Sequence, residues 1–74
     1  MKSWWFRRKF ARRQVYVNAK NGNAYKGILW DQGGGYIVLK ECELFEPGAQ
    51  PIGVDGEVAM LESNIEFIQF VNGG

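Results

Sequence analysis

The alternation of hydrophobic and polar residues changes at residue 14. From Val15 to Lys20 apolar and polar side chains alternate with a period of two, which is typical of a half-buried β-strand. The pair Asn21-Gly22 follows at once and signals a tight hairpin turn, because both residue types tolerate positive φ. The pattern therefore predicts a hairpin whose returning strand covers residues 24–30.

Three further strands are predicted downstream of this hairpin. Apolar-rich segments at 36–45, 54–61 and 65–71 are separated by a Pro/Gly loop and by a tight turn at 62–64. The Gly-rich run at 31–35 predicts a flexible connection before the first of them. Gly27 predicts a bulge or sharp bend within the second strand. Bends there and within the long third strand would let five antiparallel strands curl into a small barrel.

The first thirteen residues follow a different pattern. Ser3 can serve as an N-cap, and Trp4, Phe6 and Phe10 share one arc of a helical wheel, so we expect a short helix over 3–13. We therefore expect a single, mainly β domain. It comprises a basic aromatic N-terminal helix or arm over 1–13 and a five-stranded, strongly bent antiparallel barrel over 14–74.

Charge divides at the same boundary. Residues 1–13 hold six basic residues and no acidic one, whereas residues 14–74 hold three lysines and eight acidic residues. A basic arm on an acidic body is compatible with binding of nucleic acid or of an anionic membrane surface, and with docking against an acidic protein surface. We favour a structural role, in which the aromatic residues cover the open end of the barrel while the arginines stay solvated or pair with acidic neighbours, an acidic protein surface included. The candidate partner-binding or nucleic-acid-binding residues are Trp4, Trp5, Arg7, Arg8, Lys9, Arg12 and Arg13.

Composition argues against enzymatic activity. The 74 residues include one cysteine and no histidine, so no intrachain disulfide, Cys/His zinc site or Ser-His-Asp triad can form, and no P-loop motif is present. We expect neither cofactor nor metal. Cys42 lies in an alternating strand and is expected to be a buried, inert thiol, and Glu41 and Glu43 to lie on an exposed strand face.

So small a core without crosslinks predicts self-association. The last strand has apolar residues on both faces and is the expected contact edge, through Ile65, Phe67, Ile68 and Phe70. The sequence shows neither a signal peptide nor an apolar run long enough to span a membrane. We therefore expect a location in the cytoplasm of a host cell or in a virion.

Two segments resemble the motifs of the Sm/LSm/Hfq family. NGNAYKGIL (21–29), followed by YIVLKECELF, is similar to the first motif, and GEVAMLESNIEFIQF (56–70) to the second. The resemblance implies an Sm-like barrel that assembles into rings and binds RNA. The positions of this sequence that match the family pattern are Gly22, Tyr25, Gly27, Leu29 and, more loosely, Asp31 and Asn64.

The sequence departs from the family at the positions that hold a uracil base. The family has Asp and then Asn between its second and third strands, whereas this chain has Asp31 but no Asn. The family turn carries Arg-Gly, and the matching positions here are Leu61 and Glu62. Hfq's Tyr-Lys-His signature is also absent. The resemblance therefore supports the fold more strongly than the RNA chemistry.

A second resemblance concerns the Trp/Arg-rich N-terminus and the ending VDGEVAMLESNIEFIQF. Both are similar to small proteins encoded among the virion structural genes of tailed phages of actinobacteria. From sequence we favour a non-enzymatic Sm-like assembly module of a virion: a minor capsid, decoration or connector-associated protein bound to copies of itself or to other virion proteins. The alternative is an RNA-binding Sm/Hfq-like ring. The acidic body and the missing uracil positions favour the first.

Overall fold

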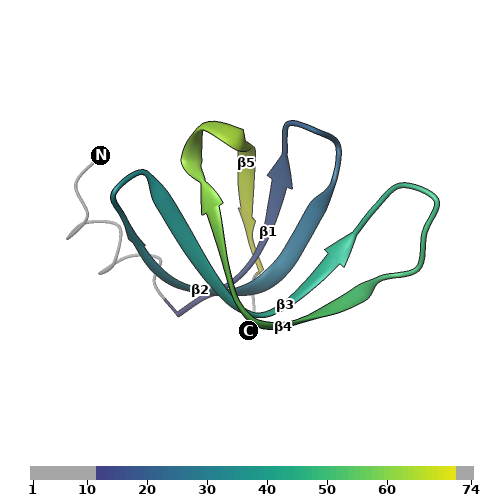
Figure 1. Ribbon diagram of the computed structural model, residues 1–74, viewed down its shortest axis with the longest axis horizontal. Coiled ribbons are helices and arrows are strands. Elements are labelled where there is room, and N and C mark those ends of the chain that lie inside the picture. Colours follow the sequence, from purple (N-terminus) through teal and green to yellow (C-terminus); the bar gives the residue numbers. More distant parts are fainter. Residues whose placement is uncertain (1–11, 72–74) are drawn as a thin grey trace.

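The computed structural model describes residues 12–71, which form one curved, five-stranded antiparallel sheet (Figure 1). The strand order is β4-β3-β2-β1-β5. This confirms the predicted number of strands and their antiparallel pairing. The elements are β1 (Gln14–Ala19), β2 (Ala24–Gly33), β3 (Tyr36–Phe45), β4 (Ile52–Leu61), the 3-10 turn η1 (Glu62–Asn64) and β5 (Ile65–Phe70).

Two predicted boundaries were wrong. β2 continues to Gly33, because Asp31, Gln32 and Gly33 pair with Val38, Ile37 and Tyr36 of β3. The expected flexible connection over 31–35 is therefore mostly strand, and only Gly34 and Gly35 form the turn. β4 begins at Ile52, two residues earlier than expected, because its first residues extend the hairpin with β3.

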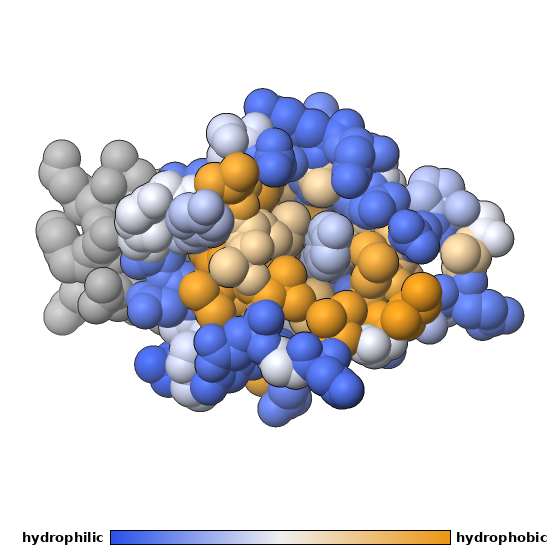
Figure 2. Space-filling view, in the orientation of Figure 1, coloured by the Kyte–Doolittle hydropathy of each residue, from blue (hydrophilic) through white to orange (hydrophobic). Residues whose placement is uncertain are grey.

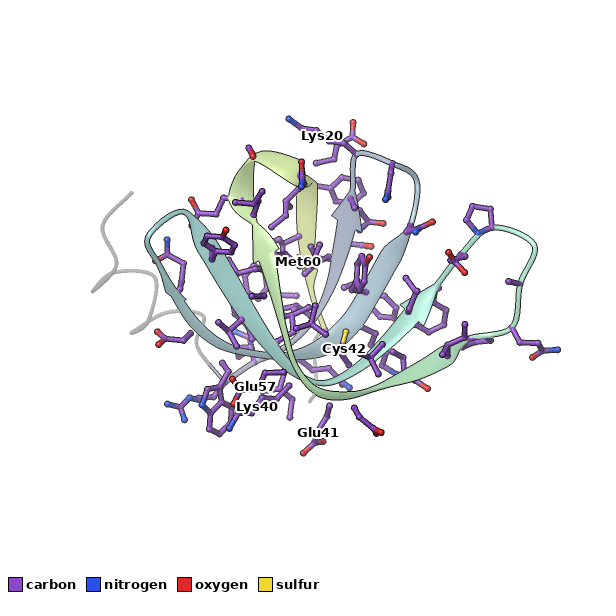
Figure 3. The ribbon with its side chains drawn as sticks, in the orientation of Figure 1. Lys20, Lys40, Glu41, Cys42, Glu57 and Met60 are labelled. Carbon is purple, nitrogen blue, oxygen red and sulfur yellow. The ribbon has the colours of Figure 1, made fainter. Side chains whose placement is uncertain are left out.

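The core occupies the concave side of the sheet. Val15, Val17, Leu29, Ile37 and Leu39 are almost completely buried, as the alternation of polar and apolar positions requires. Figure 3 shows the side chains of Cys42 and Met60 on the same side. Burial of each Val, Leu or Ile side chain contributes about 1.5–3 kcal/mol to folding.

β2 bends at Gly27, as the sequence predicted. The register between β2 and β3 shifts between Lys26 and Ile28, which places a bulge at this glycine. A Cβ atom on Gly27 would lie 2.9 Å from the Lys40 carbonyl oxygen and 3.3 Å from the Cys42 Cα. The close approach of the two backbones therefore requires a residue without a side chain.

β3 bends at Glu41. Its φ of 52° lies in the left-handed region, and on β4 the facing Gly56 has a φ of 76°. The register shifts here, because Lys40 pairs with Glu57 and Cys42 with Val54, so that Glu41 faces two residues of β4. This bulge turns the outer half of the β3–β4 hairpin away from the rest of the sheet (Figure 1).

The sheet is open at two edges. β4 pairs only with β3 and β5 only with β1 among the described residues, and β4 and β5 form no ladder with each other. The predicted barrel is therefore not closed by a continuous hydrogen-bond ladder: the sheet is strongly bent, and η1 leads from β4 to β5. Two strand edges remain available for pairing.

The predicted helix over 3–13 is wrong at its last two residues. Arg12 has a φ of 65°, and its N–H donates to the Leu29 carbonyl, while the Leu29 N–H donates to the Arg13 carbonyl at 2.8 Å. These bonds extend the pairing of β1 with β2, which excludes a helical conformation. The remainder of the predicted helix lies outside the described residues. Within residues 12–71, no helix is long and apolar enough to cross a membrane.

Candidate nucleic-acid interface

Three turns gather at one end of the sheet, at the top of Figure 1. They are the β1–β2 turn at 20–23, the β2–β3 turn at Gly34-Gly35, and η1. The Lys20 N–H donates to the Asn64 carbonyl at 2.9 Å, and the Glu62 N–H donates to the Gly35 carbonyl at 2.8 Å. Backbone hydrogen bonds therefore hold η1 against both other turns. We call this region the loop end.

A side-chain pair strengthens the contact between the β2–β3 hairpin and η1. Gln32 is 8% exposed, and its Nε2 donates a hydrogen bond to the Glu62 carboxylate. The Gln32 Oε1 is buried without a hydrogen-bond partner among the described atoms. The Gln32 N–H donates to the Asp31 carboxylate at 2.8 Å. The Asp31 carboxylate thus accepts a bond from the adjacent backbone within β2, whereas the Gln32 side chain joins the hairpin to η1.

A hollow of about 650 Å³ opens beside the loop end. Its wall includes the rings of Tyr25 and Tyr36 and the side chains of Lys20, Asn21 and Asn64. Figure 2 shows apolar side chains gathered over the middle of this face, with hydrophilic residues around them. Aromatic rings can stack on bases, amides can bond base edges, and an ammonium can bind phosphate.

A cluster of cations and one aromatic ring lies on the strands outside this hollow. The Arg12 guanidinium lies 3.8 Å and the Lys40 Nζ 3.9 Å from the centre of the same Trp30 ring. Lys40 also pairs with the Glu57 carboxylate at 3.5 Å. We call these four residues the Trp30 stack. Each cation gains electrostatic attraction from the indole face, and the stack holds Arg12 against β2.

Most other cations of the described chain also contact aromatic rings. Arg13 lies 5.6 Å from the centre of the Phe70 ring, and Lys26 lies 5.8 Å from that of Tyr16. Lys20, at the loop end, makes no such contact among the described residues. Lys20 is therefore the cation of residues 12–71 that is best placed for a ligand in the hollow.

Cys42 is a buried free thiol, as predicted, at 2% exposure. Burial raises the pKa of this thiol, and the nearby Glu43 carboxylate raises it further. A raised pKa keeps the thiolate fraction small at neutral pH, so Cys42 is a poor nucleophile. The described residues hold no group of three or more His, Cys, Asp or Glu side chains that could bind a metal ion.

Comparison with solved structures identifies the architecture. The chain is similar to the SmAP1 heptamer of P. aerophilum, with a TM-score of 0.78 and 22% identity over 89% of this chain and 88% of that one. A heptameric archaeal Sm protein matches with a TM-score of 0.75 and 22% identity over 86% and 93% of the two chains. The fold of this chain is Sm-like. No family model and no curated protein matches the sequence.

Two other structures with this Sm-like fold differ in what they contain. The Sm protein of Pyrococcus abyssii, solved in complex with a uridine heptamer, gives a TM-score of 0.77 at 18% identity, over 96% of this chain and all of that one. A chain of the NatC complex bound to CoA gives 0.74 at 16% identity, over 85% and 80%. At these identities the likeness establishes the fold, and function has to be argued from the site.

The Sm-like fold separates the residues that matched the family motifs. Gly22, with a φ of 94°, forms the predicted hairpin turn, and Tyr25 and Asn64 line the hollow. Asp31 is exposed beside Gln32. Gly27 instead lies at the bend within β2. Three of the six matching positions thus lie at or beside the loop end, and Leu29 is buried in the core.

The predicted contact residues occupy two other regions. Ile65, Phe67, Ile68 and Phe70 all belong to β5, an edge strand, and Phe67 is 51% exposed. Arg12 and Arg13 contact aromatic rings of the sheet. Trp4, Trp5, Arg7, Arg8 and Lys9 lie outside the described residues.

Sequence reasoning missed three residues of these sites. Gln32 was assigned to a flexible loop, Lys20 to the end of a strand, and Lys40 to no role. Gln32 could have been noticed from sequence, because it directly follows Asp31, which matches the family motif. No local signal predicts the Trp30 stack, because Arg12, Trp30 and Lys40 come together only through strand pairing.

Proposed function

We propose that this chain is a non-enzymatic subunit of a homo-oligomeric ring that binds single-stranded RNA. The similar Sm structures include two described as heptamers and one described as a complex with a uridine heptamer. These comparisons favour the RNA-binding alternative over the virion role that we favoured from sequence. Nothing in the fold supports a virion role, which stays a prediction from sequence.

The observation that carries the assembly is the pair of free strand edges. β4 and β5 end the sheet on its two sides, and each has one edge with unpaired backbone groups among the described residues. Pairing of β4 of one copy with β5 of the next would satisfy both edges and repeat around a closed ring. Exposed apolar side chains lie on both strands, with Ile52 at 51% and Phe67 at 51% exposure. A monomer would leave them in water.

The loop end supports the RNA part of the proposal. Tyr36 is 45% exposed and lies in the wall of the hollow beside Lys20 and Asn64, so a base could stack while an ammonium contacts phosphate. Repeating this site around a ring would present several identical base sites. Leu61 and Glu62 stand where the Sm motif carries Arg-Gly, so the arginine is missing here and we expect weaker uridine selectivity than in a family member with the full motif.

Assembly and RNA binding can be tested on the full chain. Native mass spectrometry at micromolar concentration should show a multiple of 8.4 kDa, and a folded 8.4 kDa monomer would refute the ring. Fluorescence anisotropy with labelled U-rich and A-rich heptamers should show binding that weakens with salt, with a slope of about 0.7 per phosphate contacted.

Two matched pairs of variants locate the RNA. Tyr36→Ala should weaken binding by roughly 1–3 kcal/mol if a base stacks there. Lys20→Gln should weaken binding more than Lys26→Gln, which removes the same charge from the strand surface next to Tyr16. Equal effects of the two lysine variants would place the RNA elsewhere, and rings without salt-sensitive binding would refute the RNA function.

A further inference from the structure

We propose that the basic N-terminal segment, residues 1–11, docks on an acidic face of the β3–β4 hairpin of its own chain. The acidic face consists of Glu41, Asp55 and Glu57. The inference goes beyond the ring function and concerns the protein without RNA. If the proposal is right, the acidic face competes with nucleic acid for binding of this N-terminal segment.

The acidic face surrounds a hollow created by the β3 bulge. This hollow of about 450 Å³ is lined by the three acidic residues together with Lys40, Val54 and Gly56. All three acidic residues are exposed. Beyond Lys40 the sequence contains no basic residue, so the remainder of the hairpin cannot neutralise these carboxylates.

The point at which the arm leaves the sheet directs it to this face. Arg12 lies over Trp30, Lys40 lies over the same ring, and Lys40 pairs with Glu57. The Trp30 indole and the Lys40 ammonium thus lie between Arg12 and the Glu57 carboxylate. Figure 3 shows Lys40 and Glu57 side by side, with Glu41 projecting on the same convex side of the sheet.

Length and charge of the segment match the face. Residues 1–11 contain four basic residues and no acidic one. Eleven residues span at most about 36–40 Å when extended and about 16 Å when helical. The longest extent of the molecule is 37 Å, so the extended segment is long enough to reach the whole face. Tethering also gives the segment a local concentration in the millimolar range.

Docking of this kind must depend on salt and compete with phosphate. Exposed ion pairs are individually weak and are screened over about 8 Å at physiological ionic strength. A polyanion such as RNA offers the same arginines a higher charge density than three carboxylates. The acidic face would therefore raise the RNA concentration needed to engage the arm.

The docking can be observed directly without RNA. A nitroxide can be attached selectively to Ser3→Cys, because Cys42 is buried and resists labelling. In low salt this nitroxide should broaden the amide resonances of residues 41 and 54–57. High salt, or the combined changes Arg7→Gln, Arg8→Gln and Lys9→Gln, should remove the broadening. A sample that mixes labelled, isotope-free protein with unlabelled ¹⁵N protein should show much less broadening at these positions.

Three outcomes would overturn the proposal. They are broadening centred on the loop end at Lys20 and Tyr36, no localised broadening, or equal broadening in the mixed sample, which would assign the contact to a neighbouring copy.

RNA titration gives an independent check. Neutralising Glu41, Asp55 and Glu57 to Gln or Asn should increase RNA affinity several-fold more than neutralising Glu43, Glu46 and Glu66, which changes the net charge equally. If the two triple variants increased RNA affinity equally, the effect would be general charge repulsion, and competition by the acidic face would be refuted.

Discussion

Replacement of Gly27 by alanine tests whether the bend of β2 holds the Sm-like sheet together. The new Cβ would lie 2.9 Å from the Lys40 carbonyl oxygen and 3.3 Å from the Cys42 Cα. Both atoms belong to the β3 backbone, which cannot rotate away as a side chain could. Overpacking of this kind costs about 1–3 kcal/mol, and valine at the same position should cost more.

The matched control lies in the same strand. Gly33→Ala adds the same methyl group where nothing lies within 4 Å, so it should be neutral or stabilise by up to about 1 kcal/mol. Urea unfolding at one fixed protein concentration should give a lower midpoint for Gly27→Ala than for Gly33→Ala, with the wild type at or between them. In thermal unfolding each kcal/mol corresponds to about 4–8 °C. Equal midpoints for the two variants would refute the close approach of β2 and β3 at Gly27.

Three further predictions concern the edge strand, the thiol and the Trp30 stack. Phe67→Glu should raise the concentration at which the oligomer dissociates by about tenfold or more, measured by sedimentation, whereas Ala49→Glu in the β3–β4 turn should not; equal dissociation would exclude β5 as the contact. Because the pKa of Cys42 is raised in the folded state, its contribution to stability is present below the unfolded thiol pKa of about 8.5 and is lost as pH rises through the folded value. The urea midpoint should therefore fall more steeply with alkaline pH in the wild type than in Cys42→Ala, and parallel profiles would contradict the buried thiol. Arg12→Gln should cost about 0.5–1 kcal/mol through loss of its contact with Trp30, while Lys20→Gln should cost less, as judged by urea midpoints; an unchanged midpoint for Arg12→Gln would show that the contact contributes nothing.

The strands were predictable because their signals are local. Alternation in β1, the Asn21-Gly22 turn and the glycine at the β2 bend each depend on neighbouring residues alone, and the structure bears them out. The extension of β2 to Gly33 was missed because its glycine-rich sequence favours a loop. Pairing with Tyr36 and Ile37 of β3 overrides that preference.

The candidate site was only partly predictable. Tyr25 and Asn64 were found because they match a family pattern, and they do line the hollow. The bond between Gln32 and Glu62 spans 30 positions of sequence, so no periodicity or local motif could reveal it. The same holds for the Trp30 stack, in which the β1–β2, β2–β3 and β3–β4 pairings bring together residues from four segments.

The two bends of the sheet have a consequence for the copy number of the proposed ring. In a closed ring each copy is rotated from the last by a full turn divided by the number of copies, which is about 51° for seven and about 60° for six. The angle between the outer edges of β4 and β5 has to supply this rotation. That angle is set by the curvature at Gly27 and at the facing pair Glu41 and Gly56. A change of about 9° at either bend would therefore be enough to convert one stoichiometry into the other, so that the backbone bends, and not only the side chains at the subunit contact, determine how many subunits the proposed ring contains.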